Sequence, residues 1–498
     1  MAAQGFQFLE TPGPYCVGLQ VVEQFDYSRV YRSALDALGR HYNGPRARPI
    51  QTLIWFPAAS ATAKEMSVAD YLELWKTETR FEKPTVMPEM REALAGMRQS
   101  LTTSLWARRN AAAAPGRFPV VVYAPSYSAT AWENADLCEY LASQGYVVLA
   151  SPSMGATTRG MTRDLQGIGA QVADIAFLIA HAHTLSNADT STFAVVGFSW
   201  GAMSGLFAAA RDDRIKALVS LDGSIRYYPG WVEQAGDVNP EDLTIPLLSF
   251  AQRHFSPEDQ ERYSTAAERS GRNVLNAWKH GDVVNVQMLR LTHAEHSSML
   301  QRDEHVWWKL SNVYPMMKGG YDRLDGATGY AWLARYTGKF LDAYLKENMA
   351  AKAFLRNTPE ENGVPRHNMV VELRAAAGPP VSLKAFRTEL RRRGFEHAAD
   401  VYAAMKGLRQ DFDLAEAAME CWAEELLADE HIQEAIELLQ LSVQLHPQSS
   451  AARGKLGRAY QSAGRSELAG DSYRRALELD PTNADAIMRL MLLKHGAS

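Results

Sequence analysis

Between about residues 50 and 300, short apolar runs alternate with segments of helical periodicity. Most runs are rich in Val, Ile, Leu or aromatic residues and are bounded by Gly, Pro, Ser or Asp, which is typical of strands buried on both faces. The runs span residues 51–56, 119–123, 146–150, 193–196, 217–221, 246–251 and 286–291. Helix-length segments such as 132–144 and 169–182 separate them. Repeated strand–helix–strand units predict an α/β domain with a mostly parallel sheet covered by helices.

One insertion interrupts this alternation. From about residue 60 to 116 we expect no strand, and residues 68–80 and 91–107 instead show helical periodicity with apolar side chains on one face. The insertion is either a lid over an active site or a decoration that packs on the edge of the sheet. Because apolar periodicity looks the same in both cases, the sequence leaves the two alternatives open.

The composition changes after a long helix that we expect over residues 329–345. Residues 356–366 contain two prolines, one glycine and two asparagines, which is typical of a linker. Beyond about residue 380 the whole pattern is helical. We therefore predict an α/β domain over residues 1–350, a linker over 351–380 and an all-helical domain over 381–498.

The helical segment contains an internal repeat. Residues 416–449 and 450–483 match at an offset of 34 residues, and each copy ends in a proline, Pro447 or Pro481. Small residues and aromatics occur where two paired helices approach closely, a pattern that resembles tetratricopeptide repeats. Such repeats bind a protein partner, or they pack on the first domain or mediate self-association. The small number of copies favours the second alternative.

Composition and charge narrow the function classes. The 498 residues are 46% hydrophobic and 22% charged, an ordinary globular balance, and the net charge of −5 argues against nucleic acid as the main partner. No signal peptide and no stretch of roughly 18 apolar residues is visible, so we expect a cytoplasmic protein without a transmembrane segment. A removed leader would leave the same sequence. The cysteines are too few and too far apart for a disulfide framework: Cys16, Cys138 and Cys421.

The most informative motif is Gly197-Phe-Ser199-Trp-Gly201, which lies between a Val-rich run and a stretch of small, helix-forming residues. A nucleophile elbow requires this context, with the serine on a strained turn between a strand and a helix. The glycines are needed because side chains there would strike the neighbouring strand and helix. The turn also brings the serine oxygen to a helix N-terminus, where N–H groups can face a developing oxyanion. Ser199 is therefore the predicted nucleophile.

The acid and the histidine should follow the nucleophile in that order along the chain. Asp222 directly follows the run 217–221, and an Asp at the C-terminal end of a parallel strand faces the catalytic edge of a sheet. Glu258 and Asp259, in a polar loop after the next run, are the alternatives. We predict Asp222 because it follows its strand directly.

Two histidines, His293 and His296, follow the last run. His296 lies deeper in the loop, just before the expected start of the next helix, so we predict His296 as the base and His293 as a neighbouring or surface residue. Their spacing is not that of the helical His-Glu-x-x-His zinc site, so no metal is expected, and no organic cofactor is implied.

Four segments, residues 13–18, 53–57, 118–123 and 197–201, resemble in turn the opening segment, first strand, oxyanion strand and elbow of a known group. Up to about residue 350 the chain resembles the platelet-activating factor acetylhydrolases and their dienelactone-hydrolase-like bacterial relatives. The resemblance implies an α/β-hydrolase fold with a helical insertion. It also implies an acid after the strand that follows the elbow, which supports Asp222, and a histidine before a short polar stretch, which supports His296.

The expected oxyanion loop departs from that group. Ala-Pro-Ser-Tyr-Ser, residues 124–128, stands where the family has His-Gly-x-Gly. We expect the backbone N–H of Tyr127 to act with that of Trp200 as the oxyanion donors. The alternative is that Tyr127 is a pocket-lining aromatic. The departure bears on the family's substrate preference more than on catalysis.

The sequence thus predicts a serine esterase that works through an acyl-enzyme. Ser199 attacks an ester carbonyl, His296 takes its proton, and Asp222 orients the histidine. A small-molecule carboxylic ester with a short acyl group is the expected substrate, and a thioester or small amide is an alternative. Two rivals are a non-catalytic scaffold whose repeats bind a protein, and a serine peptidase. The acidic anchor that such a peptidase needs in the insertion could be supplied by Glu65, Glu73 or Glu89.

Overall fold

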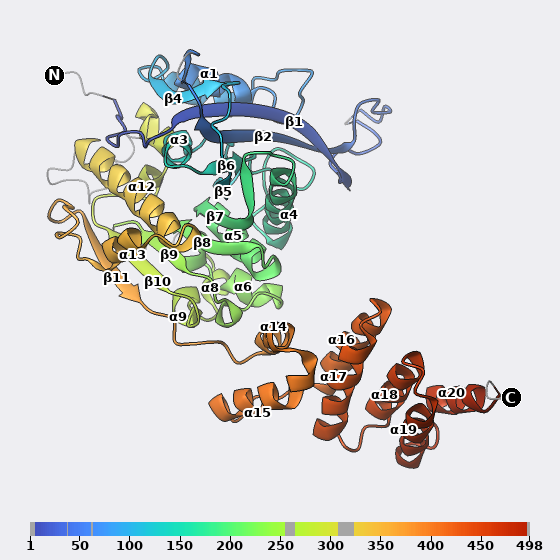
Figure 1. Ribbon diagram of the computed structural model, residues 1–498. Helices are drawn as coiled ribbons and strands as arrows, with labels where there is room; N and C mark the ends of the chain where they lie inside the picture. The colour runs from blue at the N-terminus through green and yellow to red at the C-terminus, as the bar shows by residue number, and fades with distance from the viewer. Residues whose placement is uncertain (1–4, 37, 61–62, 254–263, 307–322, 496–498) are drawn as a thin grey trace. The chain divides into compact units, whose positions relative to one another are not determined.

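The computed structural model describes residues 5–36, 38–60, 63–253, 264–306 and 323–495. The chain divides into two compact units, Met1–Gly378 and Pro379–Ser498, which we treat separately (Figure 1). The first unit therefore extends past the predicted domain boundary at residue 350.

A single sheet forms the centre of the first unit. Its strands, over the described residues, are β1 (Cys16–Val30), β2 (Ala47–Ala58), β3 (Glu65–Ser67), β4 (Ser104–Arg109), β5 (Phe118–Ala124), β6 (Val147–Ala150), β7 (Ala188–Phe198), β8 (Ile215–Leu221), β9 (Leu247–Ala251), β10 (Val283–Met288) and β11 (Met369–Arg374). Their order across the sheet is β11-β10-β9-β8-β7-β5-β6-β2-β1-β4-β3. The strands from β10 to β6 in this order run parallel, and β2 and β11 add to them in the antiparallel direction.

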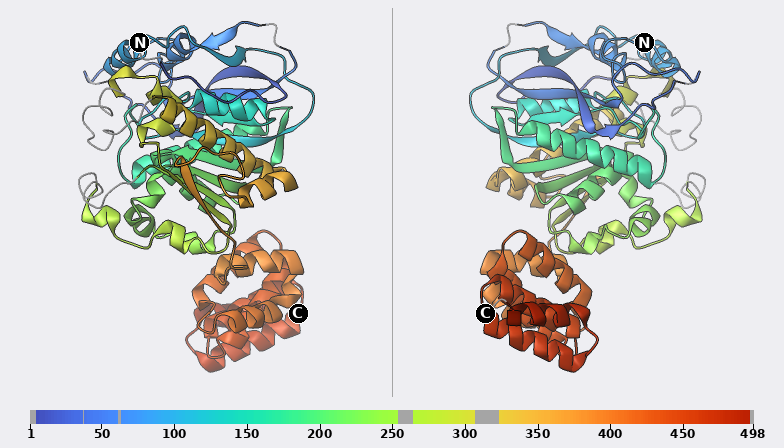
Figure 2. Two further views of the ribbon diagram at one scale, coloured as in Figure 1. Left: turned by 90° about the vertical axis from the view of Figure 1, so that its left-hand side faces the viewer. Right: turned by 90° about the vertical axis from the view of Figure 1, so that its right-hand side faces the viewer.

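Helices cover both faces of this sheet. Over the described residues, the helices of this unit are α1 (Val68–Trp75), α2 (Pro88–Gly96), α3 (Ala135–Ser143), α4 (Leu165–Ala182), α5 (Trp200–Arg211), α6 (Gly230–Ala235), α8 (Ala266–Arg269), α9 (Val274–Ala277), α10 (Ser298–Gln301), α12 (Arg323–Leu345) and α13 (Met349–Arg356). Figure 2 shows α12 in front of the sheet in one view and α4 in front of it in the opposite view. Every residue of β6 and β9 is buried, as expected for strands covered on both sides. The predicted α/β-hydrolase fold class is confirmed, and each of the seven apolar runs overlaps a strand, although the run 286–291 extends past the end of β10 at Met288.

The insertion over residues 60–116 corrects one prediction, because it contains the strands β3 and β4. Residues 91–107 do not form one helix: α2 ends at Gly96, and β4 then pairs with β1 and β3. Leu105 and Ala107 in β4 are buried at a spacing of two, which is the period of a strand. The apolar positions that suggested one helical face therefore come from a helix, a turn and a strand in succession.

The predicted linker over residues 351–380 is also wrong. It contains α13 and β11, and β11 pairs along its length with β10, from Met369 beside Met288 to Arg374 beside Val283. Leu355 of α13 is buried in the core of the first unit. The Pro, Gly and Asn residues that suggested a linker form the turns between these two elements, so the end of the sheet lies past residue 370.

Helix α4 is long and apolar enough, by length and composition alone, to cross a membrane. The sequence analysis predicted no stretch of this kind. Helix α4 contains the polar residues Gln171 and Asp174 among its apolar ones. Both polar side chains are buried in hydrogen bonds within the first unit, and Ile168, Ile175 and Leu178 belong to its hydrophobic core. Helix α4 is therefore a core helix of this unit.

The second unit is all-helical where it is described, as predicted. Its helices are α14 (Leu383–Arg393), α15 (Ala398–Leu408), α16 (Glu416–Ala428), α17 (Ile432–Leu445), α18 (Ser450–Ser462), α19 (Ser466–Leu479) and α20 (Ala484–His495). Helices α16 and α17 form one packed pair, and α18 and α19 form the next. A Cβ added to Gly457 in α18 would lie 2.6 Å from the Tyr473 ring in α19, so the glycine lets the two helices approach.

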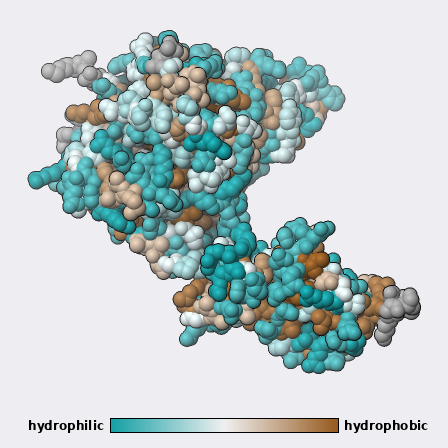
Figure 3. All heavy atoms as spheres, in the orientation of Figure 1, coloured by the Kyte–Doolittle hydropathy of each residue, from teal (hydrophilic) through white to brown (hydrophobic). Residues whose placement is uncertain are grey.

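The surface of both units is mixed. On the face drawn in Figure 3, hydrophilic side chains predominate and hydrophobic ones are scattered in small groups. Single exposed apolar residues are normal on a folded protein.

Candidate active site

Ser199 lies on the turn between β7 and α5, as the elbow motif predicted. Its backbone has φ 52° and ψ −115°, a strained conformation for a residue with a side chain. Hydrogen bonds from both backbone groups maintain it: the Ser199 N–H donates to Leu221 O at 3.1 Å, and the Ser199 carbonyl accepts from the N–H groups of Ser224 at 2.9 Å and Ala202 at 3.2 Å. The turn is thus fixed to the end of the neighbouring strand β8.

The two glycines of the motif are required by close backbone contacts. A Cβ on Gly197 would lie 2.5 Å from Ala202 N, and a Cβ on Gly201 would lie 2.0 Å from Ala124 O. Both distances are far below van der Waals contact, so only glycine fits at either position. The glycines let α5 start directly against the strand that ends at the oxyanion loop.

Asp222 follows β8 directly, and its side chain is fully buried. Its carboxylate accepts three hydrogen bonds: one from His293 Nδ1 at 2.6 Å, one from the Tyr227 hydroxyl at 2.6 Å, and one from the Gln252 N–H at 2.8 Å. Burial alone would raise the pKa of Asp222, but the hydrogen bond and charge of His293 outweigh it and lower the pKa to about 2. Asp222 is therefore ionised at neutral pH. The alternative acids, Glu258 and Asp259, lie outside the described residues.

His293, and not His296, completes the constellation. Its Nε2 lies 2.9 Å from Ser199 Oγ while its Nδ1 contacts Asp222, so one imidazole links the serine to the acid. Its backbone N–H donates to Gln252 Oε1 at 3.0 Å, and its ring packs against Phe198 with centroids 5.0 Å apart. The side chain is 45% exposed, in contrast to the fully buried Asp222.

The predicted role of His296 is corrected by this geometry. His296 is fully buried, its Nδ1 contacts Thr292 O at 2.9 Å, and its ring is nearly parallel to that of Phe198. Within the described part of the chain its Nε2 has no hydrogen-bond partner. Burial lowers the pKa of His296, which favours the neutral ring. The deeper position in the loop, which favoured His296 in the sequence, takes it into the core and away from Ser199.

The loop after β5 lies beside the elbow. The Ser126 N–H donates to Glu133 Oε2 at 2.8 Å, and the Tyr127 hydroxyl donates to Met161 O. Among the described hydrogen bonds, none is donated by the backbone N–H of Tyr127 or of Trp200, the first residue of α5. The Tyr127 ring packs edge-on against the Trp200 ring, with centroids 6.2 Å apart. These two N–H groups are thus available to a ligand, and their predicted oxyanion role stays a prediction.

Two neighbouring residues that the sequence analysis missed fix the loops of the site. Buried Glu133 holds the oxyanion loop through Ser126. Buried Asn134 holds the histidine loop, because its amide donates to His296 O at 3.1 Å and accepts from the Ser298 N–H at 2.9 Å. Burial raises the pKa of Glu133 to about 7, against the lowering effect of the Ser126 hydrogen bonds. In the sequence, the two could have been noticed as adjacent polar residues, Glu and Asn, within an otherwise apolar segment of helical periodicity.

The insertion is also connected to this region. Glu78, which follows α1, is buried and forms an ion pair with Arg159 at 2.7 Å. The same guanidinium donates to Ser128 O at 3.0 Å, in the predicted oxyanion loop, and to the carbonyl of the next residue, Ala129, at 3.2 Å. The insertion therefore contributes strands to the sheet and, through Arg159, is linked to the predicted oxyanion loop.

No metal centre is visible over the residues that the structure describes, since no group of three His, Cys, Asp or Glu side chains there could hold an ion. A polar groove of about 370 Å³ lies at the β10–β11 end of the sheet. Its lining includes Arg226, Tyr227, Asn285 and Arg374 but none of the three linked residues.

Fold and site together define an α/β-hydrolase with a Ser–His–Asp arrangement. Residues 99–328 match the profile of the X-Pro dipeptidyl-peptidase (S15) family, and this region contains Ser199, Asp222 and His293. The match covers less than half of the chain. Among curated proteins, no relative matches the sequence.

Among solved structures, the chain is similar to a ferulic acid esterase from Streptomyces cinnamoneus. The two share 18% sequence identity with a TM-score of 0.48, over 69% of this chain and 94% of that one.

Proposed function

We propose that the protein is a serine hydrolase that cleaves a carboxylic ester through an acyl-enzyme. The observation that carries the proposal is the pair of contacts of His293, 2.9 Å to Ser199 Oγ and 2.6 Å to Asp222. A general base must lie within hydrogen-bond reach of the proton that it removes, and a third group must orient it. His293 meets both requirements.

In the proposed mechanism, His293 Nε2 accepts the proton of Ser199 as Oγ attacks the ester carbonyl. The carboxylate of Asp222 keeps the proton of His293 on Nδ1 and stabilises the imidazolium. His293 then returns the proton to the departing alcohol. Water repeats the sequence on the acyl-enzyme and releases the acid. Because Asp222 is ionised at neutral pH, it can stabilise the positive ring throughout.

The developing oxyanion would be bound by the backbone N–H groups of Tyr127 and Trp200. Both groups lack a hydrogen-bond partner among the described residues, as donors reserved for a substrate should. Trp200 begins α5, so its N–H also carries the positive end of the helix dipole. Two such donors compensate for the absence of the His-Gly-x-Gly loop.

A peptidase is the second candidate, and the match of residues 99–328 to the X-Pro dipeptidyl-peptidase family favours it. An enzyme of this kind needs an acidic group for the substrate amine. The acids proposed from the sequence suit this role poorly, because Glu65 pairs with Arg108 at 2.7 Å and Glu73 with Lys76 at 2.5 Å. Glu89 is exposed on α2. We therefore keep the ester as the first proposal.

The experiment that separates these candidates compares p-nitrophenyl esters, from acetate to decanoate, with Xaa-Pro p-nitroanilides. A kcat/KM for a short ester well above that for every anilide supports the esterase. The reverse order supports the peptidase. A scaffold without activity would hydrolyse neither series and would leave Ser199 unlabelled by a fluorophosphonate.

For the helical unit we propose tetratricopeptide-like repeats that mediate self-association. The support is the repeated helix pair and the Gly457–Tyr473 contact. Light scattering of the full chain over a concentration series tests this role: a constant monomer mass contradicts it, and a protein partner then becomes the alternative.

A further inference from the structure

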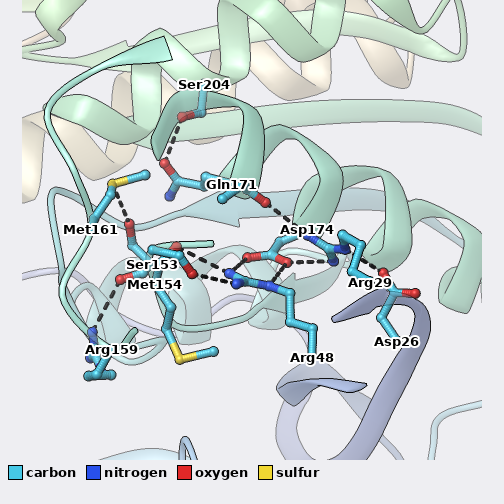
Figure 4. Close-up of polar contacts among 12 residues, drawn as sticks. Asp26, Arg29, Arg48, Ser153, Met154, Arg159, Met161, Gln171, Asp174 and Ser204 are labelled. Carbon is cyan, nitrogen blue, oxygen red and sulfur yellow. Dashed lines mark hydrogen bonds and ion pairs between the residues drawn. The ribbon is translucent and has the colours of Figure 1, made fainter. Parts of the chain in front are cut away.

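Gln171 is a buried amide in α4 that contacts both the predicted oxyanion loop and the helix that follows Ser199. Its Nε2 donates to Pro125 O at 2.8 Å, and its Oε1 accepts from the Ser204 hydroxyl at 2.7 Å. Pro125 belongs to the oxyanion loop, and Ser204 lies one turn into the helix that Trp200 begins. Figure 4 shows the Gln171 side chain pointing toward Ser204.

The contact with Pro125 fixes one whole peptide unit. The peptide between Pro125 and Ser126 is planar, so its C=O and N–H groups move together. Gln171 binds its C=O group, and Glu133 binds its N–H group at 2.8 Å. A peptide plane bound at both ends cannot rotate freely. With this plane fixed, only φ and ψ of Ser126 remain to set the direction of the next amide, that of Tyr127.

Helix α4 is itself anchored next to Gln171. Asp174, one turn further along, accepts two hydrogen bonds from the buried Arg48, at 2.7 and 2.6 Å, and one from Arg29 at 2.8 Å. Arg48 also donates to the carbonyls of Met154 and Gly155 (Figure 4). Buried charges with these partners keep the helix in one position, so the Gln171 amide is presented from a rigid element.

We propose that Gln171 is a positioning residue of the reaction. By binding both Pro125 O and the Ser204 hydroxyl, it fixes the distance between the backbone N–H groups of Tyr127 and Trp200. This inference rests on the proposed serine hydrolase. Its consequence is specific to the transition state, because the two amides bind an oxyanion and not the ester in its ground state.

The test uses Gln171→Met in the full-length protein. Methionine has a similar length and removes both hydrogen bonds while filling the space. Ser204→Ala breaks only the contact with α5. Gln166→Met is the matched control, since Gln166 is exposed on the same helix. For each variant we would measure kcat and KM on p-nitrophenyl acetate, the melting temperature, and the Ki of a methyl trifluoromethyl ketone, whose hydrated adduct with serine resembles the tetrahedral intermediate.

We expect Gln171→Met to lower kcat about 10- to 100-fold, less than the loss of an oxyanion donor, with KM changed by less than about threefold. The trifluoromethyl ketone Ki should rise by the same factor as kcat falls. Ser204→Ala should lose about threefold, and the double variant should be no worse than Gln171→Met, because the two side chains act through one contact. Gln166→Met should match the wild type.

Three results would overturn the inference. An unchanged kcat in Gln171→Met shows that the bridge does not matter. A structural role only is shown if the melting temperature falls, KM and Ki rise by the same factor, and both return to their wild-type values when the assay is cooled. A wild type that is inactive and whose Ser199 is not labelled by a fluorophosphonate rejects the proposed serine hydrolase itself. The first two results reject only the role of Gln171.

Discussion

His293 Nε2 lies 2.9 Å from Ser199 Oγ, whereas His296, one turn further along, is buried against Phe198. The two rings pack on the same aromatic side chain, yet only one reaches the serine. His293→Ala should therefore lower kcat/KM on p-nitrophenyl acetate by at least about 10³-fold without loss of stability. His296→Phe retains a ring against Phe198 and should stay within about tenfold of wild type. The opposite ranking would restore His296 as the base.

The strained backbone of Ser199 predicts that relieving the strain stabilises the fold, although the enzyme loses its nucleophile. At φ 52° a side chain is disfavoured, so Ser199→Gly should unfold at a higher denaturant concentration than Ser199→Ala, by about 1 kcal/mol in the free energy of unfolding. Both variants should be inactive. Equal stability of the pair would mean that the turn holds no strain.

The buried ion pair of Glu78 and Arg159 predicts a pH-dependent stability. Burial raises the pKa of Glu78 to about 7, although the charge of Arg159 opposes the shift. A carboxyl whose folded pKa exceeds its unfolded value stabilises the fold at low pH, and this contribution is lost as pH rises from about 4.5 to 7.

The free energy of unfolding of the wild type should fall between pH 5 and pH 8, and Glu78 should account for on the order of 2 kcal/mol of that fall. Glu78→Gln should remove this part of the difference. Denaturation followed by tryptophan fluorescence measures it. Glu73→Gln, the same change at an exposed position nearby, should leave the difference as in the wild type. If both variants behave alike, the pH dependence does not come from Glu78.

The proposed oxyanion donor is the backbone of Tyr127 and not its phenol, since the hydroxyl already donates to Met161 O. Tyr127→Phe should keep kcat within about threefold. Tyr127→Pro removes the N–H and should lose about 10²–10³-fold in kcat. Circular dichroism of the proline variant is needed to show that it folds. A large loss in Tyr127→Phe would assign the role to the phenol.

The central sheet and the elbow were predictable because their signals are local. Each parallel strand is a short apolar run, and a Cβ on Gly197 would strike Ala202, which lies only a few positions away along the chain. Asp222 was found in the same way, since it follows its strand directly.

The remaining features depend on packing between distant segments. Strands β1, β4 and β11 lie near the sheet edges, where half-exposed residues give a weak pattern. The choice between His293 and His296 depends on which ring enters the core beneath Phe198, and sequence spacing does not contain that information. Gln171 shows the same limit, because its partners lie 46 and 33 residues away along the chain.

The most direct test of the account is hydrolysis of p-nitrophenyl acetate by the wild type and by Ser199→Ala, with fluorophosphonate labelling of both. We predict turnover and labelling in the wild type and neither in the variant. Hydrolysis that survives in Ser199→Ala, or a folded wild type that shows neither turnover nor labelling on any ester, would contradict the serine hydrolase.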